Sequence, residues 1–366
     1  MTEPTTDMGP PRPRRWHIFV PTIAIVVLVA IYAVYWSAVS REVRAALEDF
    51  RISPQHGLIA GWGDLTVGGF PYRIEARFAA PALSAPTTPE AWAWKGEAAE
   101  VALLPHNLRH VIVNLRGKQE LRYRDLSTAR SSENILHTTA EGAWGSYVDM
   151  PGAPFGRLAV DVENVEARHR RGANGIDDRI DAKRLQLHLR PAPADTATDT
   201  HTAHYDIAVQ GDGISLGLAQ PVPILGMDIR RLMAQARARN LPNVERLSAV
   251  ELLERWQAAG GALAISDLIV QWGPLDMMAS GELTLDAANR LQGRLDAEIA
   301  DFEGLLAAMA RDGLVREREA RIALAGLIMV SQFQGSEPGR VRLPITMNEG
   351  RLYLGPLPVA ELLPLY

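Results

Sequence analysis

The chain contains no cysteine among its 366 residues. This absence excludes disulfide bonds, catalysis by a thiolate and zinc sites built on sulfur ligands. An excess of positive charge is also lacking, because the net charge is −5 at pH 7, and phosphate binding needs a basic surface. Nucleic acid is therefore not an expected partner. Hydrophobic residues make up 47% and charged residues 22%, which is typical of a chain that folds around a core.

One segment stands out because it carries no charge. Residues 18–40 hold no Asp, Glu, Lys or Arg, and about 20 mostly apolar residues are enough to cross a hydrocarbon core of roughly 30 Å. Tyr32, Tyr35 and Trp36 gather near its far end, as aromatic residues do at a membrane interface. The pattern predicts a cytoplasmic tail at residues 1–17, a transmembrane helix at 18–40, and a juxtamembrane helix and linker at 41–56.

The orientation of this segment does not follow from its flanking charges. Three arginines lie on each side of it, within residues 12–15 and 41–51, so the basic residues tie. We expect a single-pass protein of the inner (cytoplasmic) membrane with its N-terminus in the cytoplasm, because the tail is short and no second span follows. The alternatives are a cleaved signal peptide, with small residues Ala38 and Ser40 at cleavage spacing, and a buried core helix.

Beyond residue 57 the apolar side chains recur with a period of two. Ile74, Ala76 and Phe78 alternate with charged residues, and three leucines do so in residues 184–190. Such segments are typical of strands with one wet face and one apolar face. They recur over residues 57–215, 262–300 and 340–357, with short connections rich in Gly, Pro, Asn and Asp that suit antiparallel hairpins.

Helical spacing of apolar residues interrupts the strands at four places. In residues 228–239, Ile229, Leu232, Met233 and Ala236 share one side of a predicted helix that Asp228 would cap. A capping box at Ser248 opens a second helix, which runs to the glycines at 260–261. The third helix is expected from residue 302 to the glycine at 313, and the fourth over about 316–333.

These elements predict an α+β fold that is mostly β. A long, curved antiparallel sheet carries amphipathic helices on its apolar side and is preceded by one N-terminal transmembrane helix. Residues 57–366 would form this sheet domain in the periplasm. The polar, Pro- and Thr-rich loop 191–202 is the candidate for an internal boundary.

Short motifs for chemistry are present but incomplete. Residues 213–217 match the G-x-S-x-G pattern around Ser215, but prolines follow where a nucleophile elbow needs a helix, so we expect a hairpin turn. His201, His204 and Asp206 have no further ligand nearby, and we expect a solvated strand edge, not a metal site. The pair of histidines in residues 106–110 lacks the glutamate of the metalloprotease motif. We expect no catalytic residue, no metal and no cofactor.

Two stretches carry a family resemblance. The first runs from Gly61 through VGGFPYRIEARF, and the second is the C-terminal LPITMNEGRLYLGPLPVAELLPLY. Together with the apolar segment they resemble the domain-of-unknown-function family 2125 and, more loosely, the AsmA-like envelope proteins. The first family implies no activity. The AsmA-like resemblance implies a protein anchored in the inner membrane of the Gram-negative envelope, with larger members moving lipid along a curved apolar groove. This chain is much shorter than those members. A structural role is expected for the motif glycines and their neighbours, namely Gly69, Phe70, Pro71, Tyr72, Arg73, Gly350, Gly355 and Pro356.

The leading hypothesis for function is a non-enzymatic, membrane-anchored periplasmic protein that binds or handles lipid in an apolar groove. A phospholipid or another apolar ligand is the expected partner besides the membrane, and protein partners are not identified. The alternatives are an interaction scaffold for envelope partners and, more remotely, a periplasmic hydrolase. The helical apolar residues are most simply core residues, and those that would line a groove are Leu232, Met233, Leu252, Trp256, Phe302, Leu305, Leu306 and Met309.

Overall fold

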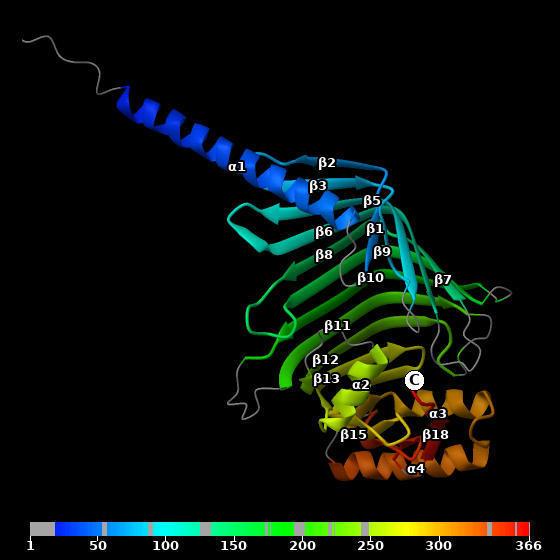
Figure 1. The fold of residues 1–366 in the computed structure, drawn as a ribbon. Helices are drawn as coiled ribbons and strands as arrows, with labels where there is room; N and C mark the ends of the chain where they lie inside the picture. Colours follow the sequence, from blue (N-terminus) through cyan, green and yellow to red (C-terminus); the bar gives the residue numbers. More distant parts are fainter. Residues whose placement is uncertain are drawn as a thin grey trace, which may run out of the picture.

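The computed structural model describes residues 19–52, 57–86, 91–124, 133–172, 175, 177–193, 202–218, 222, 224–242, 249–334, 339–355 and 357–365. Its first element is α1 (Val20–Ile52), one unbroken helix of 33 residues that joins the predicted transmembrane and juxtamembrane segments. The N-terminal half of α1 projects away from the body, while its C-terminal half lies against the sheet (Figure 1). Within the described residues, α1 alone is long and apolar enough to cross a membrane.

A single antiparallel sheet of eighteen strands accounts for most of the described chain, which confirms the predicted mostly β fold. The strands are β1 (Ile59–Gly61), β2 (Asp64–Gly68), β3 (Ile74–Ala79), β4 (Ala82–Ala85), β5 (Trp92–Leu104), β6 (Asn107–Arg124), β7 (Glu133–Thr139), β8 (Gly142–Val148), β9 (Arg157–Arg171), β10 (Asp177–Pro191), β11 (Thr202–Gly217), β12 (Asp228–Pro242), β13 (Ala262–Trp272), β14 (Leu275–Leu285), β15 (Leu291–Ala300), β16 (Arg340–Asn348), β17 (Arg351–Leu354) and β18 (Leu357–Glu361).

From β8 to β18, each strand pairs with the next one along the chain, so this part of the sheet is a meander. At the other end, β2, β3, β5 and β6 follow one another, and the shorter β7 and β8 both lie between β6 and β9. β10 and β11, on either side of the loop at 191–202, pair along most of their length. Several of these connections are short, as between β13 and β14 or β16 and β17, which agrees with the predicted hairpins, whereas helices intervene within residues 243–261 and 301–339.

The longest strands are bent along one line across the sheet. On β9, β10 and β11, Asn164, Lys183 and Gly213 lie at aligned positions where the regular pairing is interrupted. Asn164 and Gly213 have positive φ values of 47° and 57°, a conformation that turns the strand locally. We call this line of residues the crease, and Figure 1 shows that the long strands of the sheet are bent. Buried apolar residues on both sides of the crease form one cluster, so the apolar face is on the inside of the bend.

The predicted helices of the C-terminal half are α2 (Ala249–Ala258), α3 (Phe302–Arg311) and α4 (Glu317–Gln334). Three of the four helical predictions are thus confirmed, and Ser248 of the predicted capping box lies outside the described residues. Asp301 caps α3 by accepting a hydrogen bond from the backbone of Gly304 at 3.1 Å. The apolar sides of α3 and α4 pack on β14, β15 and β16 and complete the main hydrophobic core.

The predicted helix at residues 228–239 is wrong, because this segment is strand β12. Its Leu, Met, Ala and Arg residues favour helices, and its apolar residues Ile229, Leu232, Met233 and Ala236 fit the spacing of a helix. The same segment also alternates, with Leu232, Ala234 and Ala236 opposite Met233, Gln235 and Arg237. Pairing with β11 on one side and β13 on the other satisfies its backbone, so the tertiary structure overrides the local preference.

Candidate functional site

The two faces of the sheet differ in chemistry. On β10, Arg184, Gln186 and His188 define the polar face, and Leu185, Leu187 and Leu189 define the apolar face. Arginine–carboxylate pairs cover the polar face from strand to strand. The described pairs include Arg184–Asp161, Arg231–Asp212, Arg237–Asp206, Arg239–Glu282, Arg116–Glu100 and Arg342–Glu298.

These pairs fix the charge of the carboxylates. Arg184 donates two hydrogen bonds to Asp161, at 2.9 and 2.6 Å, and lowers the pKa of that carboxyl. Hydrogen bonds from Arg237 and Arg190 lower the pKa of Asp206, with the larger effect from Arg237. Glu298 has a lowered pKa for the same reason, beside Arg342 and Arg340. The polar face is therefore a charged outer surface that favours water.

The apolar face carries an unbroken row of small or aliphatic residues, one from each of β2, β3, β5, β6 and β8–β16. Residues directly opposite each other in an antiparallel pair point to the same face, so the row follows from the pairing. It runs Val67, Ala76, Val101, Val113, Gly145, Val160, Leu187, Val209, Ala234, Leu268, Ala279, Ala297 and Leu343. We call this the apolar row. At about 4.8 Å for each of its strand-to-strand steps, it is about 58 Å long.

Both ends of the apolar row are covered. At the first end, α1 lies on β1, β2 and β3, where Leu65, Ile74 and Ala76 are buried. At the last end, α3 and α4 cover the strands, and Ala279 and Ala297 belong to the main core.

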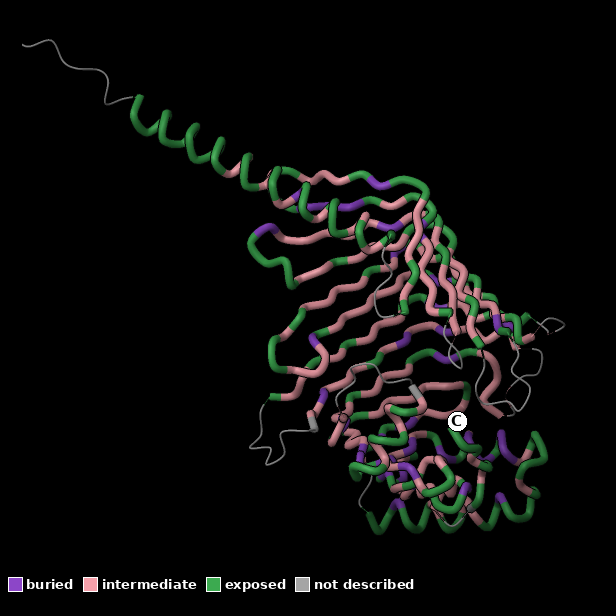
Figure 2. Tube along the Cα trace, viewed as in Figure 1, coloured by how far each residue is buried: buried purple, intermediate pink, exposed green. Residues whose placement is uncertain are grey.

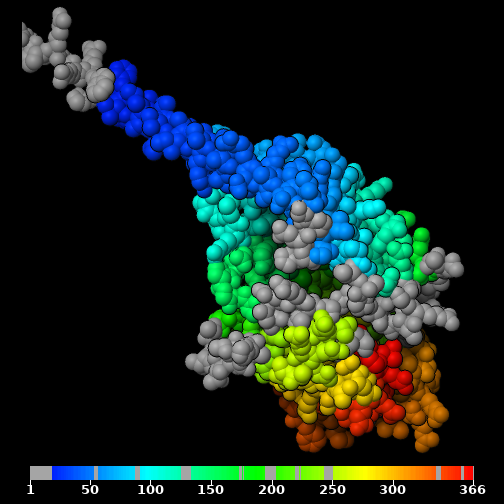
Figure 3. Space-filling view, viewed as in Figure 1, coloured from blue at the N-terminus to red at the C-terminus, as the bar shows by residue number. Residues whose placement is uncertain are grey.

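Among the described residues, no helix covers the middle of the row as α1, α3 and α4 cover its ends. Val101, Val113, Val160, Leu187 and Leu268 are only half-buried, and Val209 is 37% exposed. Figure 2 accordingly colours most of the middle strands as intermediate. In the space-filling view the molecule is hollowed between the N-terminal elements and α2, with green strands behind the opening (Figure 3). We call this stretch, the apolar face of β5, β6 and β8–β13, the apolar trough.

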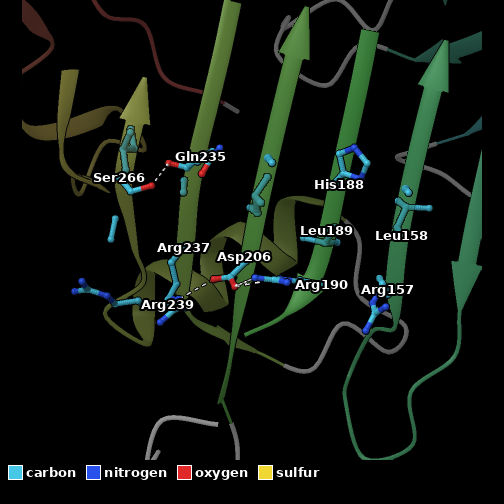
Figure 4. A pocket seen from close by; sticks show the side chains of 16 residues that line it. Arg157, Leu158, His188, Leu189, Arg190, Asp206, Gln235, Arg237, Arg239 and Ser266 are labelled. Carbon is cyan, nitrogen blue, oxygen red and sulfur yellow. Dashed lines mark hydrogen bonds and ion pairs between the residues drawn. The ribbon is translucent and has the colours of Figure 1, made fainter. Parts of the chain in front are cut away.

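A separate concavity of about 740 Å³ lies on the polar face of β9–β13 (Figure 4). Arg157, Arg190, Arg237 and Arg239 line it, and Asp206 within the lining pairs with Arg190 and Arg237. Figure 4 shows Asp206 between Arg190 and Arg237, and it shows a helix behind the strands. Three of its four arginines are therefore already paired with carboxylates, because Arg239 pairs with Glu282.

The predicted groove residues separate into three groups. Leu232 lies on the apolar face, but its neighbour Met233 points to the polar face because β12 is a strand. Leu252 and Trp256 are half-buried on α2, and the Trp256 indole donates to the carbonyl of Arg239 at 2.7 Å. The remaining four are buried in the core between the helices and β14–β16, and these are Phe302, Leu305, Leu306 and Met309.

The structural motif residues lie at turns. Gly69 to Arg73 form the turn between β2 and β3, where Gly69 has φ 99° and an added Cβ would lie 2.6 Å from the Arg73 carbonyl. Gly350 and Gly355 sit at the turns that flank β17, both with positive φ. Pro356 lies outside the described residues.

Residues considered for chemistry are occupied by structural contacts. Ser215 lies inside β11, so the predicted hairpin turn is wrong; Gly213 of this motif belongs to the crease, and the Ser215 hydroxyl donates to Asp228 at 2.9 Å. His204 accepts a hydrogen bond from the Asn240 backbone at 3.2 Å. β11 lies between β10 and β12, so the predicted strand edge is also wrong, while His201 is outside the described residues. The described residues contain no cluster of three potential metal ligands.

Sequence reasoning missed the residues that make the middle of the trough. The alternation of residues 184–190 revealed Leu187, but nothing in the sequence places Val209 or Val160 beside it, because that requires the register of three strands. Because residues 228–239 were predicted to be a helix, Ala234 was not recognised as a residue of the apolar face. Period-two counting over that segment was the available signal.

The comparisons with known proteins identify a family but no individual relative. No curated protein and no solved structure matches the chain. One family model matches residues 36–362, from within α1 to beyond β18, and its description is "uncharacterized protein conserved in bacteria". The looser similarity to AsmA-like proteins stays a prediction. The match covers most of the chain, and the protein belongs to the DUF2125 family of bacterial proteins.

Proposed function

We propose that this protein is held in the inner membrane by α1, with its body in the periplasm, and that the apolar trough binds the acyl chains of a lipid. Its role is binding or handling lipid, not catalysis. The observation that carries this proposal is the half-buried middle of the apolar row, which continues without a polar interruption from the covered end at α1.

Physical chemistry supports an apolar occupant. A continuous exposed apolar surface is costly in water, and soluble proteins keep such patches small unless they bind something. Each methylene group moved from water into an apolar environment contributes about 0.8 kcal/mol. The uncovered middle of the row, from Val101 to Leu268, has seven steps and is about 34 Å long, which is comparable with the roughly 30 Å of a whole hydrocarbon core, so it is long enough for acyl chains.

The direct test is to identify what co-purifies with the full chain. We expect native mass spectrometry of the protein, extracted in a mild detergent, to detect bound lipid. Leu187→Asp puts a charge on the floor of the trough and should abolish that binding. His188→Asp, on the neighbouring residue and the polar face, is the matched control and should retain it. Circular dichroism and thermal unfolding confirm that both variants fold, and lipid retained equally by both would overturn the proposal.

An interaction scaffold is the second candidate function. The outward side of α4 supports it, because Ile322, Met329 and Phe333 are exposed there, Phe333 to 86%. Exposed apolar residues grouped on one helix side are typical of protein–protein contacts. A stoichiometric protein partner that is lost in a Phe333→Ser variant, together with the absence of bound lipid, would favour the scaffold over lipid binding.

A further inference from the structure

The first contacts between α1 and the sheet come from three aromatic residues. The Tyr32 hydroxyl donates to the carbonyl of Pro71, and the Trp36 indole donates to the carbonyl of Arg73 at 3.1 Å. The Tyr35 hydroxyl donates to the carbonyl of Pro105 at 3.0 Å. Two turns of the sheet, at residues 69–73 and 105–109, are therefore fixed to the helix at this level. We call them the two tips.

These contacts begin so near the N-terminus of α1 that the helix before them is too short to cross a bilayer. The contacted turns must therefore lie at the membrane if α1 spans it. A helix rises about 1.5 Å per residue, so about 20 residues are needed for a core of roughly 30 Å. Tyr32, Tyr35 and Trp36 all lie within the uncharged segment 18–40, and only residues 20–31 of α1 precede Tyr32. These 12 helical residues span about 18 Å, which is less than the thickness of the core, so the first contacts lie at or inside the hydrocarbon boundary on the side of the body. A tilted helix would cross less depth and increase this shortfall.

The chemistry of the tips suits that depth. Tyr72 is 84% exposed, and Phe70 and Leu108 are each 49% exposed, although large apolar side chains are usually buried. Phe70 lies against Trp36, with ring centroids 5.4 Å apart. Within the two tips the charged residues are arginines, Arg73 and Arg109, with no carboxylate. Aromatic rings beside arginines are the composition found at the interface of a bilayer.

We propose that the two tips are inserted into the interfacial layer of the leaflet that faces the body, so that the sheet stands on the membrane by its strand turns as well as by α1. This inference rests on the proposed function, because it requires α1 to span the bilayer. It adds which part of the sheet meets the bilayer. Val67 and Ala76, at the end of the apolar row that α1 covers, lie on the two strands that flank the tip at 69–73.

The absence of cysteine makes the test direct, because one introduced cysteine labels one position. We would attach an environment-sensitive fluorophore to Tyr72→Cys and Leu108→Cys in the full chain, reconstituted in phosphatidylcholine and phosphatidylglycerol vesicles. Lipids with a spin label near the headgroup should quench both positions and shift their emission to the blue. Asp296→Cys, on β15 with a side chain 75% exposed, is the aqueous control and should show neither effect.

A label at Ile25→Cys separates the inference from the proposal on which it rests. Ile25 lies in the exposed N-terminal half of α1, and lipids with a spin label deep in the acyl chain should quench it. Quenching at residue 25 with unquenched labels at residues 72 and 108 would overturn the inference and leave the anchor standing. No quenching at residue 25 would overturn the anchor and the inference together.

Discussion

Ala234 of β12 lies directly opposite Val209 of β11, on the same side of the sheet, whereas the adjacent Met233 lies opposite Gln210 on the other side. Opposite residues in an antiparallel pair have Cβ atoms about 4.5–5.5 Å apart. Since the chain has no cysteine, we expect the double variant Val209→Cys/Ala234→Cys to react completely with a short thiol cross-linker.

The matched control for this register is Val209→Cys/Met233→Cys, whose thiols would lie on opposite faces. Mass spectrometry of the intact protein measures the cross-linked fraction in both variants. Efficient cross-linking of the control, or none in the first pair, would show that residues 228–239 do not form the strand described for β12.

The covered end of the sheet should behave as a conventional core. Leu306 is 6% exposed between α3 and β14–β16, so Leu306→Ala should lower the free energy of unfolding by about 2–5 kcal/mol through lost burial and a residual cavity. Denaturant unfolding measures this loss. In contrast, Val209→Ala at the 37% exposed trough position should cost clearly less. An equal cost at both positions would indicate that the trough is sealed.

Gly213 is expected to be important for the bend of the sheet. Its φ of 57° is unfavourable for residues with a Cβ atom, and a Cβ there would approach the Lys183 side chain to 2.8 Å. Gly213→Ala should therefore lower the free energy of unfolding by about 1–2 kcal/mol. Gly68→Ala is the control, because no φ restriction applies and no atom lies within 4 Å of its added Cβ. A Gly213→Ala variant as stable as the control would contradict the role of the crease.

The arginine–carboxylate pairs predict how stability depends on pH. The folded-state pKa of Asp206 is lowered, chiefly by Arg237, so its contribution to stability is fully present above its unfolded pKa of about 3.9. That contribution is lost as the pH falls through the lower, folded-state pKa. Arg237→Gln should thus reduce the loss of stability between about pH 5 and pH 2.

Urea unfolding at a series of pH values tests this dependence. The control is Arg230→Gln, on the same strand, since no described ion pair involves Arg230. The interpretation fails if Arg237→Gln and the control lose stability with acid to the same extent as the original chain.

The sequence predicted the fold class because the relevant information is local. Alternating leucines define the apolar face of β10, and the spacing of Phe302, Leu305 and Met309 defines the inner side of α3. The residues of the candidate site were harder to predict from the sequence. The predicted groove residues came from helices, where apolar spacing is most visible, and α3 proved to seal the core. The open surface consists of single residues from many strands, and their alignment depends on pairing that no single segment encodes.

The error at β12 has the same origin. Ala, Arg, Leu and Met are good helix formers, and Leu232 and Ala236 satisfy both a period of four and a period of two. What decides between them is the presence of two neighbouring strands with unsatisfied edges. The contact between the aromatic residues of α1 and the turn at Phe70 was likewise invisible, although both motifs were recognised separately.

The meander gives the protein a length that is modular. From β8 to β16, each strand contributes one residue to the apolar row and pairs with the next strand along the chain. Adding or removing one hairpin would change the row by about 10 Å and leave every other pair in register. The length of the apolar row can therefore be changed without altering the cross-section of the sheet.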